Sequence, residues 1–393
     1  MRRELERIEI PGEHGARERS WAVVAAAYAG REPAPRRRSW KPVAAVALAL
    51  VVVAGLLSPP GRAVLDGVRD AVGVESTPPL KLPADGKLLV VSVERGGVWI
   101  VRRDGSRRRL GAYEDATWSP FGRYLVATTR SRLVALDNDG RERWSLPARR
   151  PAWPRWGGSR TDTRIAYVAG STLHVVAGNG RGDRPLAQGV NTPPAWRPSA
   201  GHVLAYTQPG ALHVVDTETG RELWGRSRVE PAFSLLWSAD GTRLATLSNV
   251  AVAIYDGSTG GLIRRLAFAK PSFPAGETPG FPVAAAFAPS GHDLALVVRS
   301  EQGGRRSRIL LLRGASARGP TGIFLGAGVI GDVAWSPDGR WLLADWRGAD
   351  QWVFLRMPRV GRALAVPGIA AQFPRADGKG PLLWLEGRWC CAP

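Results

Sequence analysis

Short runs of apolar residues alternate with turn residues over most of the chain beyond residue 83. One phrase recurs: an aromatic residue, then a turn made of small residues, Pro, Asp and Gly, then an apolar run. Pro presets φ for a turn and Gly supplies a positive φ. Apolar runs of this length between such turns are typical of β-strands. The pattern therefore predicts an all-β domain of many short strands.

The aromatic residue of this phrase recurs at a nearly constant interval. Its positions are Trp118, Trp156, Trp196, Trp237, Phe287 and Trp335. They lie 38, 40, 41, 50 and 48 residues apart. A period near 40 with about four strands per repeat is typical of the blades of a β-propeller. We expect each aromatic side chain to fill the wedge between two neighbouring blades.

The number of blades depends on the C-terminal segment. The first repeat begins at Lys87 and lacks an inner strand, whereas 387–391 offers a spare strand with Trp389 in the place of the aromatic residue. If this strand completes the first blade, the ring has seven blades and no free edge. The alternative treats 373–378 as an eighth motif. We predict a seven-bladed β-propeller over 83–393.

An apolar segment precedes this domain. Residues 43–57 carry no charge and follow a basic cluster at 36–41. The run is short for a membrane span, which needs about 20 residues; a cleaved signal peptide is the alternative. The long tail and the absence of a small-x-small site favour an uncleaved transmembrane helix at 42–60. The positive-inside rule then places 1–41 in the cytoplasm as a basic tail and the propeller outside, joined by a juxtamembrane helix and linker at 61–82.

The formal net charge is +20, carried by 49 arginines and only five lysines. Such a charge favours an anionic partner, but a GC-rich coding sequence also enriches Arg. The arginines are scattered and no nucleic-acid-binding motif accompanies them, so nucleic acid is not expected. The two cysteines, Cys390 and Cys391, are adjacent. Neighbours in a strand point to opposite faces, so they need not meet; a vicinal disulfide or reactive pair is the alternative.

Two resemblances follow from the repeat. The phrase 335–344, beginning Trp335-Ser336-Pro337, resembles the repeat of TolB-type, WD-like propellers, and the layout is similar to that of bacterial membrane-anchored propellers. This resemblance implies architecture and little about function. The segment 214–224, ending in Trp224, and a looser copy ending in Trp144 resemble the repeat of pyrroloquinoline-quinone enzymes. Only these two blades carry the Trp, which indicates shared blade construction.

A candidate binding surface follows from loop lengths. In a four-stranded blade, the turns between second and third strands and the blade-to-blade connections lie on one face. The long segments 147–155, 270–282, 300–308 and 372–381 all belong to this class, and insertions concentrate where binding occurs. These segments contain the candidate ligand-binding residues Arg149, Arg150, Trp153, Arg155, Arg305, Arg306, Arg308 and Arg375. The alternative is passive loop growth with Arg as the default polar residue.

Catalytic chemistry is weakly represented in the sequence. No G-x-S-x-G motif is present. His174 and His213 occupy matching positions of adjacent repeats, so they either line a channel and bind a metal or occupy solvated positions. The sequence implies no cofactor. We expect a binding or scaffolding propeller for an envelope protein, peptide or anionic polymer. The alternatives are a quinone- or metal-dependent enzyme and a transmembrane signalling protein with a cytoplasmic partner on the tail.

Overall fold

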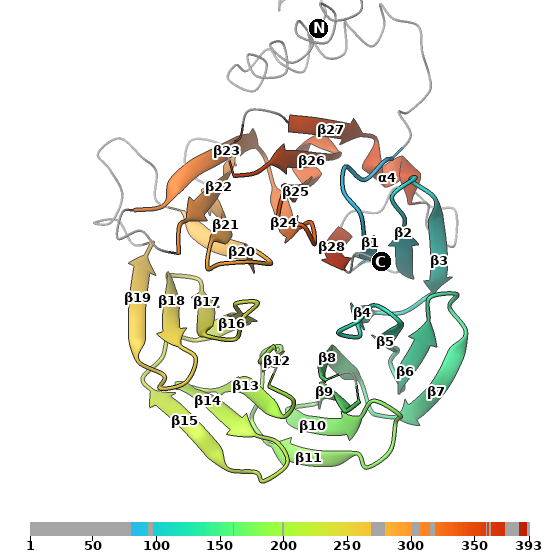
Figure 1. Cartoon of the computed structure of the whole chain (residues 1–393), viewed down its shortest axis with the longest axis vertical. Coiled ribbons are helices and arrows are strands. Elements are labelled where there is room, and N and C mark those ends of the chain that lie inside the picture. The colour runs from blue at the N-terminus through green and yellow to red at the C-terminus, as the bar shows by residue number, and fades with distance from the viewer. Residues whose placement is uncertain are drawn as a thin grey trace, which may run out of the picture. The chain divides into compact units, whose positions relative to one another are not determined.

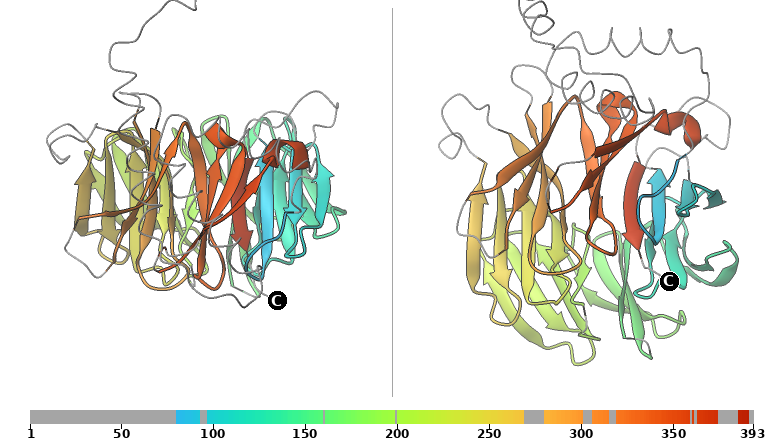
Figure 2. Two further views of the ribbon diagram at one scale, coloured as in Figure 1. Left: turned by 90° about the horizontal axis from the view of Figure 1, so that it is seen from above. Right: turned by 45° about the horizontal axis from the view of Figure 1, so that its top comes forward.

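The strands form seven four-stranded antiparallel sheets set around an axis, each with one strand nearest the centre (Figure 1). A computed structural model describes residues 80–390 except 93–96, 160, 199, 269–279, 301–305, 315–318, 359, 361–362 and 374–384. Seen from the side, the sheets make a short disc with the strands running through its thickness (Figure 2). This arrangement confirms the seven-bladed β-propeller.

The blades are numbered in chain order, with their strands given from the axis outward. Blade 1 contains β28 (Leu385–Cys390), β1 (Lys87–Ser92), β2 (Gly97–Val101) and β3 (Arg107–Gly111). Blade 2 contains β4 (Asp115–Trp118), β5 (Tyr124–Thr128), β6 (Arg132–Asp137) and β7 (Glu142–Pro147). Blade 3 contains β8 (Pro151–Gly158), β9 (Thr163–Ala169), β10 (Thr172–Ala177) and β11 (Arg184–Ala187).

The remaining four blades follow the same order. Blade 4 contains β12 (Ala195–Trp196), β13 (Val203–Gln208), β14 (Ala211–Asp216) and β15 (Glu222–Ser227). Blade 5 contains β16 (Ala232–Trp237), β17 (Arg243–Ser248), β18 (Ala251–Asp256) and β19 (Leu262–Ala267). Blade 6 contains β20 (Phe281–Phe287), β21 (Leu294–Ser300), β22 (Arg306–Leu312) and β23 (Thr321–Ala327). Blade 7 contains β24 (Ile330–Trp335), β25 (Trp341–Trp346), η3 (Arg347–Ala349), β26 (Gln351–Arg356) and β27 (Ala363–Pro367), with α4 (Ile369–Gln372) after it.

The C-terminal strand closes the ring. β28 pairs with β1 along its whole length, with Trp389 opposite Leu88. The Trp389 ring meets Phe354 of blade 7 edge to face at 5.8 Å, so this strand also contacts the last blade. Phe373, the first residue of the alternative eighth motif, is fully buried beside Trp352 and Trp99. It therefore fills the junction between blades 7 and 1 and begins no further blade.

The repeated tryptophans join each blade to the one before it. In blades 4, 5 and 7 the indole N–H donates to the backbone carbonyl directly before the aromatic residue of the preceding blade, whereas the buried indole N–H of Trp156 has no partner among the described residues and that of Trp389 donates to Asp85 O at 3.2 Å. The bonds run from Trp196 to Arg155 (2.9 Å), from Trp237 to Ala195 (3.1 Å) and from Trp335 to Ala286 (2.9 Å). The side chain thus fills the wedge as predicted and also satisfies a carbonyl on the inner strand of the neighbouring blade.

Two further tryptophans, on outer strands, join their blade to the blade that follows it. Trp144 and Trp224 lie on outer strands and donate to Gly178 and Gly257, at 3.0 Å each, in the outer turn of the following blade. A Cβ at Gly260, whose φ is +67°, would lie 2.4 Å from the Trp224 ring. Glycine is therefore required there for both the turn and the close approach. This arrangement accounts for the Trp-containing outer strands without a quinone site.

The expected span 42–60, the tail 1–41 and most of the linker 61–82 lie outside the described residues. Among the residues that are described, no helix is long and apolar enough to cross a membrane. The last part of the linker is described: Leu80 and Leu82 are buried against blades 7 and 1, as is Ala84 at the start of the propeller domain.

Blade 7 contains a buried ion pair. Asp345, on β25, is 5 % exposed, and its carboxylate accepts a hydrogen bond from Nε of Arg347 at 2.7 Å. Burial raises the pKa of Asp345 to about 6 even though Arg347 lowers it. The folded protein therefore holds this proton more tightly than the unfolded chain does.

We predict that Trp237→Phe lowers the free energy of unfolding by about 1 kcal/mol, because it removes one hydrogen bond and leaves the Ala195 carbonyl unpaired. Trp237→Ala should cost about 3–5 kcal/mol, because it also empties the wedge. Urea denaturation of the two variants separates the contributions. Equal costs for the Phe and Ala variants would show that filling the wedge does not contribute to stability, and would contradict the packing role of the ring.

A second prediction concerns pH. Because the raised pKa of Asp345 makes the folded state bind a proton that the unfolded state releases above its own pKa of 3.8, stability should fall as pH rises from about 4 to about 6. Relative to Asp345→Asn, the wild type should lose up to about 3 kcal/mol over that window. Urea denaturation of both proteins at pH 4 and pH 7 measures it. A wild-type-minus-variant difference that stays constant or grows with pH would contradict the assignment.

Candidate functional site: the central cavity

The inner strands of four blades depart from regular pairing where they approach the axis. In β8, β16, β20 and β24 the pairing with the second strand shifts by one residue, near Trp153, Phe233, Val283 and Gly331. A β-bulge of this kind bends the strand and redirects a side chain. All four of these residues line the space between the blades. The bulges therefore shape the surface of the centre.

That space is a cavity of about 1060 Å³, lined by six blades and by Pro193 on the connection leading into blade 4. Ligand pockets typically measure about 300–1,000 Å³ and combine an apolar lining with a few polar groups. Here the prolines and alanines of the short turns surround one end, for example Pro120, Ala239 and Pro337. The charged residues among the described lining are Glu114, Asp115, Arg155 and Asp332.

The acidic residues of the described lining lie on one side of the cavity: Glu114 just before β4, Asp115 at its start and Asp332 on β24. Together with Thr128, at the end of β5, they form what we call the acidic arc. Asp115 and Asp332 each stand three residues before the Trp of their repeat, so they occupy equivalent positions in blades 2 and 7. Glu386 of β28 occupies the same position in blade 1, between them. Three consecutive blades thus carry an acidic residue at one register position.

Backbone amides hold the two aspartates in the same orientation. The N–H of Ala116 donates to Asp115 Oδ1 at 2.7 Å, and the N–H of Val333 donates to Asp332 Oδ1 at 2.8 Å. Asp115 Oδ2 lies 3.6 Å from Nη1 of Arg155, the basic residue of the described lining. Both side chains of this pair are largely buried, at 18 % and 25 % exposure.

The opposite side is apolar. We call Trp153, Phe233, Val283 and Ala284, from β8, β16 and β20, the apolar arc. Trp153 has a φ of +51° and packs against the core between blades 3 and 4. A bulky residue with positive φ is rare and strained, and such strain is concentrated at functional sites. The cavity therefore has one acidic and one apolar side.

The predicted loop residues prove to be distributed differently from expectation. The segment 147–155 is not a long loop: β8 begins at Pro151, so only 148–150 connect the blades. Arg149 and Arg150 are exposed on this connection, whereas Trp153 and Arg155 line the cavity. The prediction failed here because Pro151 and Pro154 resemble loop residues, whereas β8 accommodates them at its start and at its bulge.

The other candidates fall in blade 6 or outside the described residues. Arg306 and Arg308 belong to β22, the third strand of that blade, so they are strand residues and not loop residues. Arg305 and Arg375 lie outside the described residues. Asp115 and Asp332 were missed, although aligning the repeats on their aromatic residue would have shown them at matching positions.

The four histidines that the structure describes do not line the cavity. His174 and His213 lie on third strands, stacked on Tyr167 and Tyr206 with ring centres 5.0 and 5.1 Å apart. His174 Nδ1 lies 3.3 Å from Asp183. A metal-binding pair in the channel is therefore the wrong interpretation of their matching positions. Within the described ranges, no group of three His, Cys, Asp or Glu residues is placed to hold a metal ion.

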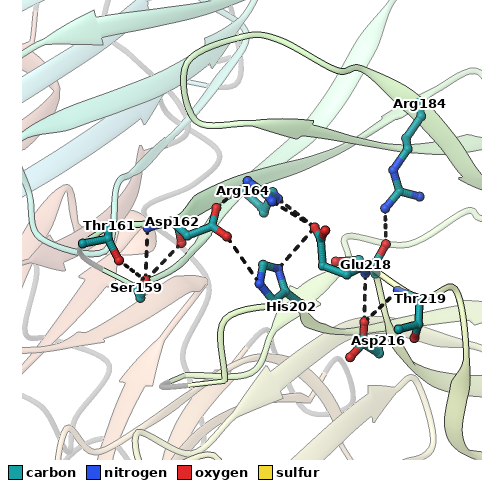
Figure 3. Close-up of polar contacts among 10 residues, drawn as sticks. Ser159, Thr161, Asp162, Arg164, Arg184, His202, Asp216, Glu218 and Thr219 are labelled. Atoms are coloured by element: carbon teal, nitrogen blue, oxygen red, sulfur yellow. Dashed lines mark hydrogen bonds and ion pairs between the residues drawn. The ribbon is translucent and has the colours of Figure 1, made fainter.

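A polar network joins blades 3 and 4 at the end of the disc with the short turns (Figure 3). Arg164 binds Glu218 at 2.9 Å and also contacts Asp162. His202 lies between the same two carboxylates, 3.4 Å from each. The Arg164 hydrogen bond lowers the pKa of Glu218. Each acid of this network already has cationic neighbours within the fold, so the network links blades and offers little to a ligand.

Cys390 ends β28 beside the cavity and is disulfide-bonded. Its sequence neighbour, Cys391, lies outside the described residues. Of the two interpretations of the cysteines, a disulfide therefore fits Cys390 better than a free thiol does.

Comparisons with known protein families and with curated proteins found no match. Among solved structures, a candidate 6-phosphogluconolactonase from Bacteroides uniformis is 12 % identical with a TM-score of 0.54, over 77 % of this chain and all (100 %) of that one. A functionally unknown protein from Desulfotomaculum acetoxidans gives 12 % and 0.53, over 72 % and 96 % of the two chains. Hsv2 from Kluyveromyces lactis gives 13 % and 0.51, also over 72 % and 96 %. At these identities the likeness shows the fold alone: the chain is similar to seven-bladed and related propellers.

Proposed function

We propose that this chain is a binding module that holds a ligand in its central cavity, and that the segment 42–60 anchors it in the cytoplasmic membrane with the propeller outside. The cavity supports the first part, because it lies at the centre of the ring and has the size and mixed lining of a ligand site. The basic cluster before the apolar segment supports the second part.

The ligand is expected to enter from the end of the disc that carries the blade connections. β4 and β24 begin at that end, so the acidic arc lies close to it. Arg149 and Arg150 are exposed on the connection between blades 2 and 3, which is hydrogen-bonded to the β5–β6 turn through Arg150 N–H and Arg130 O. These two arginines form a second binding surface in this proposal, and its ligand would be an envelope protein, a peptide or an anionic polymer.

Filling the cavity tests the proposal. We expect Ala284→Phe, on the cavity side of β20, to reduce ligand capture at least tenfold, whereas Ala363→Phe, exposed on β27, should leave it unchanged. The measurement is native mass spectrometry of full-length detergent-solubilised protein after incubation with envelope extract. Equal capture by Ala284→Phe and wild type would reject the cavity. Loss in an Arg149→Ala, Arg150→Ala variant alone would place binding at the exposed arginines.

The anchor has its own test. Full-length protein should sediment with membranes and resist extraction by high salt, because an apolar span is held by burial in lipid and not by charge. A variant lacking residues 1–60 should appear in the soluble fraction. Release of the full-length chain by salt, or N-terminal cleavage after residue 57, would contradict a transmembrane helix.

A further inference from the structure

We propose that the ligand of the cavity carries a cationic head, a primary amine or guanidinium, on an apolar body. This inference deepens the proposed function and rests on it. The head would lie at the acidic arc and the body against the apolar arc.

The charged side chains of the acidic arc offer hydrogen-bond acceptors. Ionised Glu114, Asp115 and Asp332 only accept. Arg155 is the basic side chain of that lining, and its Nη1 already donates to the Pro154 carbonyl at 2.9 Å and lies near Asp115. A ligand head that enters this arc therefore has to donate hydrogen bonds, and a cation does so most strongly.

Thr128 provides an independent observation. It lines the same arc, is 1 % exposed, and its hydroxyl has no hydrogen-bond partner among the described residues. It lies directly opposite Asp115 in the pairing of β4 with β5. An unpaired buried hydroxyl is unfavourable. A ligand N–H between Asp115 and Thr128 would supply the missing partner.

Two arginines lie near the acidic arc outside the cavity lining. Arg130 lies 3.4 Å from Glu114, but its side chain is 82 % exposed, so solvent screens the pair. Arg347 packs against Gly331 from behind β24 and is paired with the buried Asp345. Neither arginine is among the residues that line the cavity.

The apolar arc determines the rest of the ligand. Trp153, Phe233 and Val283 present two aromatic rings and an aliphatic side chain to the cavity. Burying an apolar body against them is favourable by area. The combination suits an amphipathic organic cation better than an inorganic ion.

Three probes of nearly equal shape test the charge: 4-phenylbutylamine, 4-phenylbutanol and 4-phenylbutyrate. With full-length protein in detergent, isothermal titration should show the amine binding about tenfold more tightly than the alcohol, and the carboxylate most weakly. Asp332→Asn and Asp115→Asn should each weaken amine binding about tenfold and leave the alcohol unchanged. Asp139→Asn, on the exposed β6–β7 turn, is the matched control and should change nothing.

Thr128→Val keeps the shape of the side chain and should weaken amine binding about threefold. This variant tests the same arc even if one of the Asp variants folds poorly. Equal binding of amine and alcohol, or preference for the carboxylate through Arg155, would overturn the cationic head. In that case, loss of probe binding in Ala284→Phe would still support the cavity as a binding site and would reject only the cationic head. Binding of none of the three probes would overturn this inference and leave the proposed function to the extract experiment.

Discussion

The structure depends on one repeated contact, an aromatic ring wedged between two sheets, whose indole N–H in blades 4, 5 and 7 is bonded to the inner strand of the preceding blade. Sheets packed around an axis diverge outward, so the junction near the centre needs a large rigid side chain with one polar atom that finds a partner. Trp196, Trp237 and Trp335 meet both needs. Phe287 fills the same place in blade 6 without a ring N–H, which shows that packing is the general requirement and the hydrogen bond an addition.

The cavity is a consequence of the same geometry. Because the aromatic residue of each repeat occupies the junction, the residues three and four positions before it face the centre, where bulges in four blades redirect them. Their identities differ from blade to blade, since wedge packing does not constrain them. Acidic residues cluster on blades 7 and 2, and apolar ones on blades 3, 5 and 6. A protein with net charge +20 thus has an acidic side to its centre.

Much of the fold could be predicted because its signals are local. The aromatic residue, the turn and the spacing near 40 each depend on a few neighbouring residues, and the spare strand around Trp389 is visible as soon as blade 1 is found incomplete. The loop assignment failed for the opposite reason. Whether Pro151 begins a strand depends on its partner Ala169 in β9, and the place of Arg155 depends on a bulge defined by the same pairing.

The sequence by itself determined the all-β class, the seven repeats and the closing strand, because periodic patterning and turn chemistry act over short distances along the chain. The apolar segment 42–60 is likewise a sequence feature, and its role stays a prediction. Only the tertiary structure decided which residues meet. Asp115, Thr128, Trp153 and Asp332 share one cavity although up to 217 positions separate them, because closing the ring brings the equivalent place of every blade to a common axis.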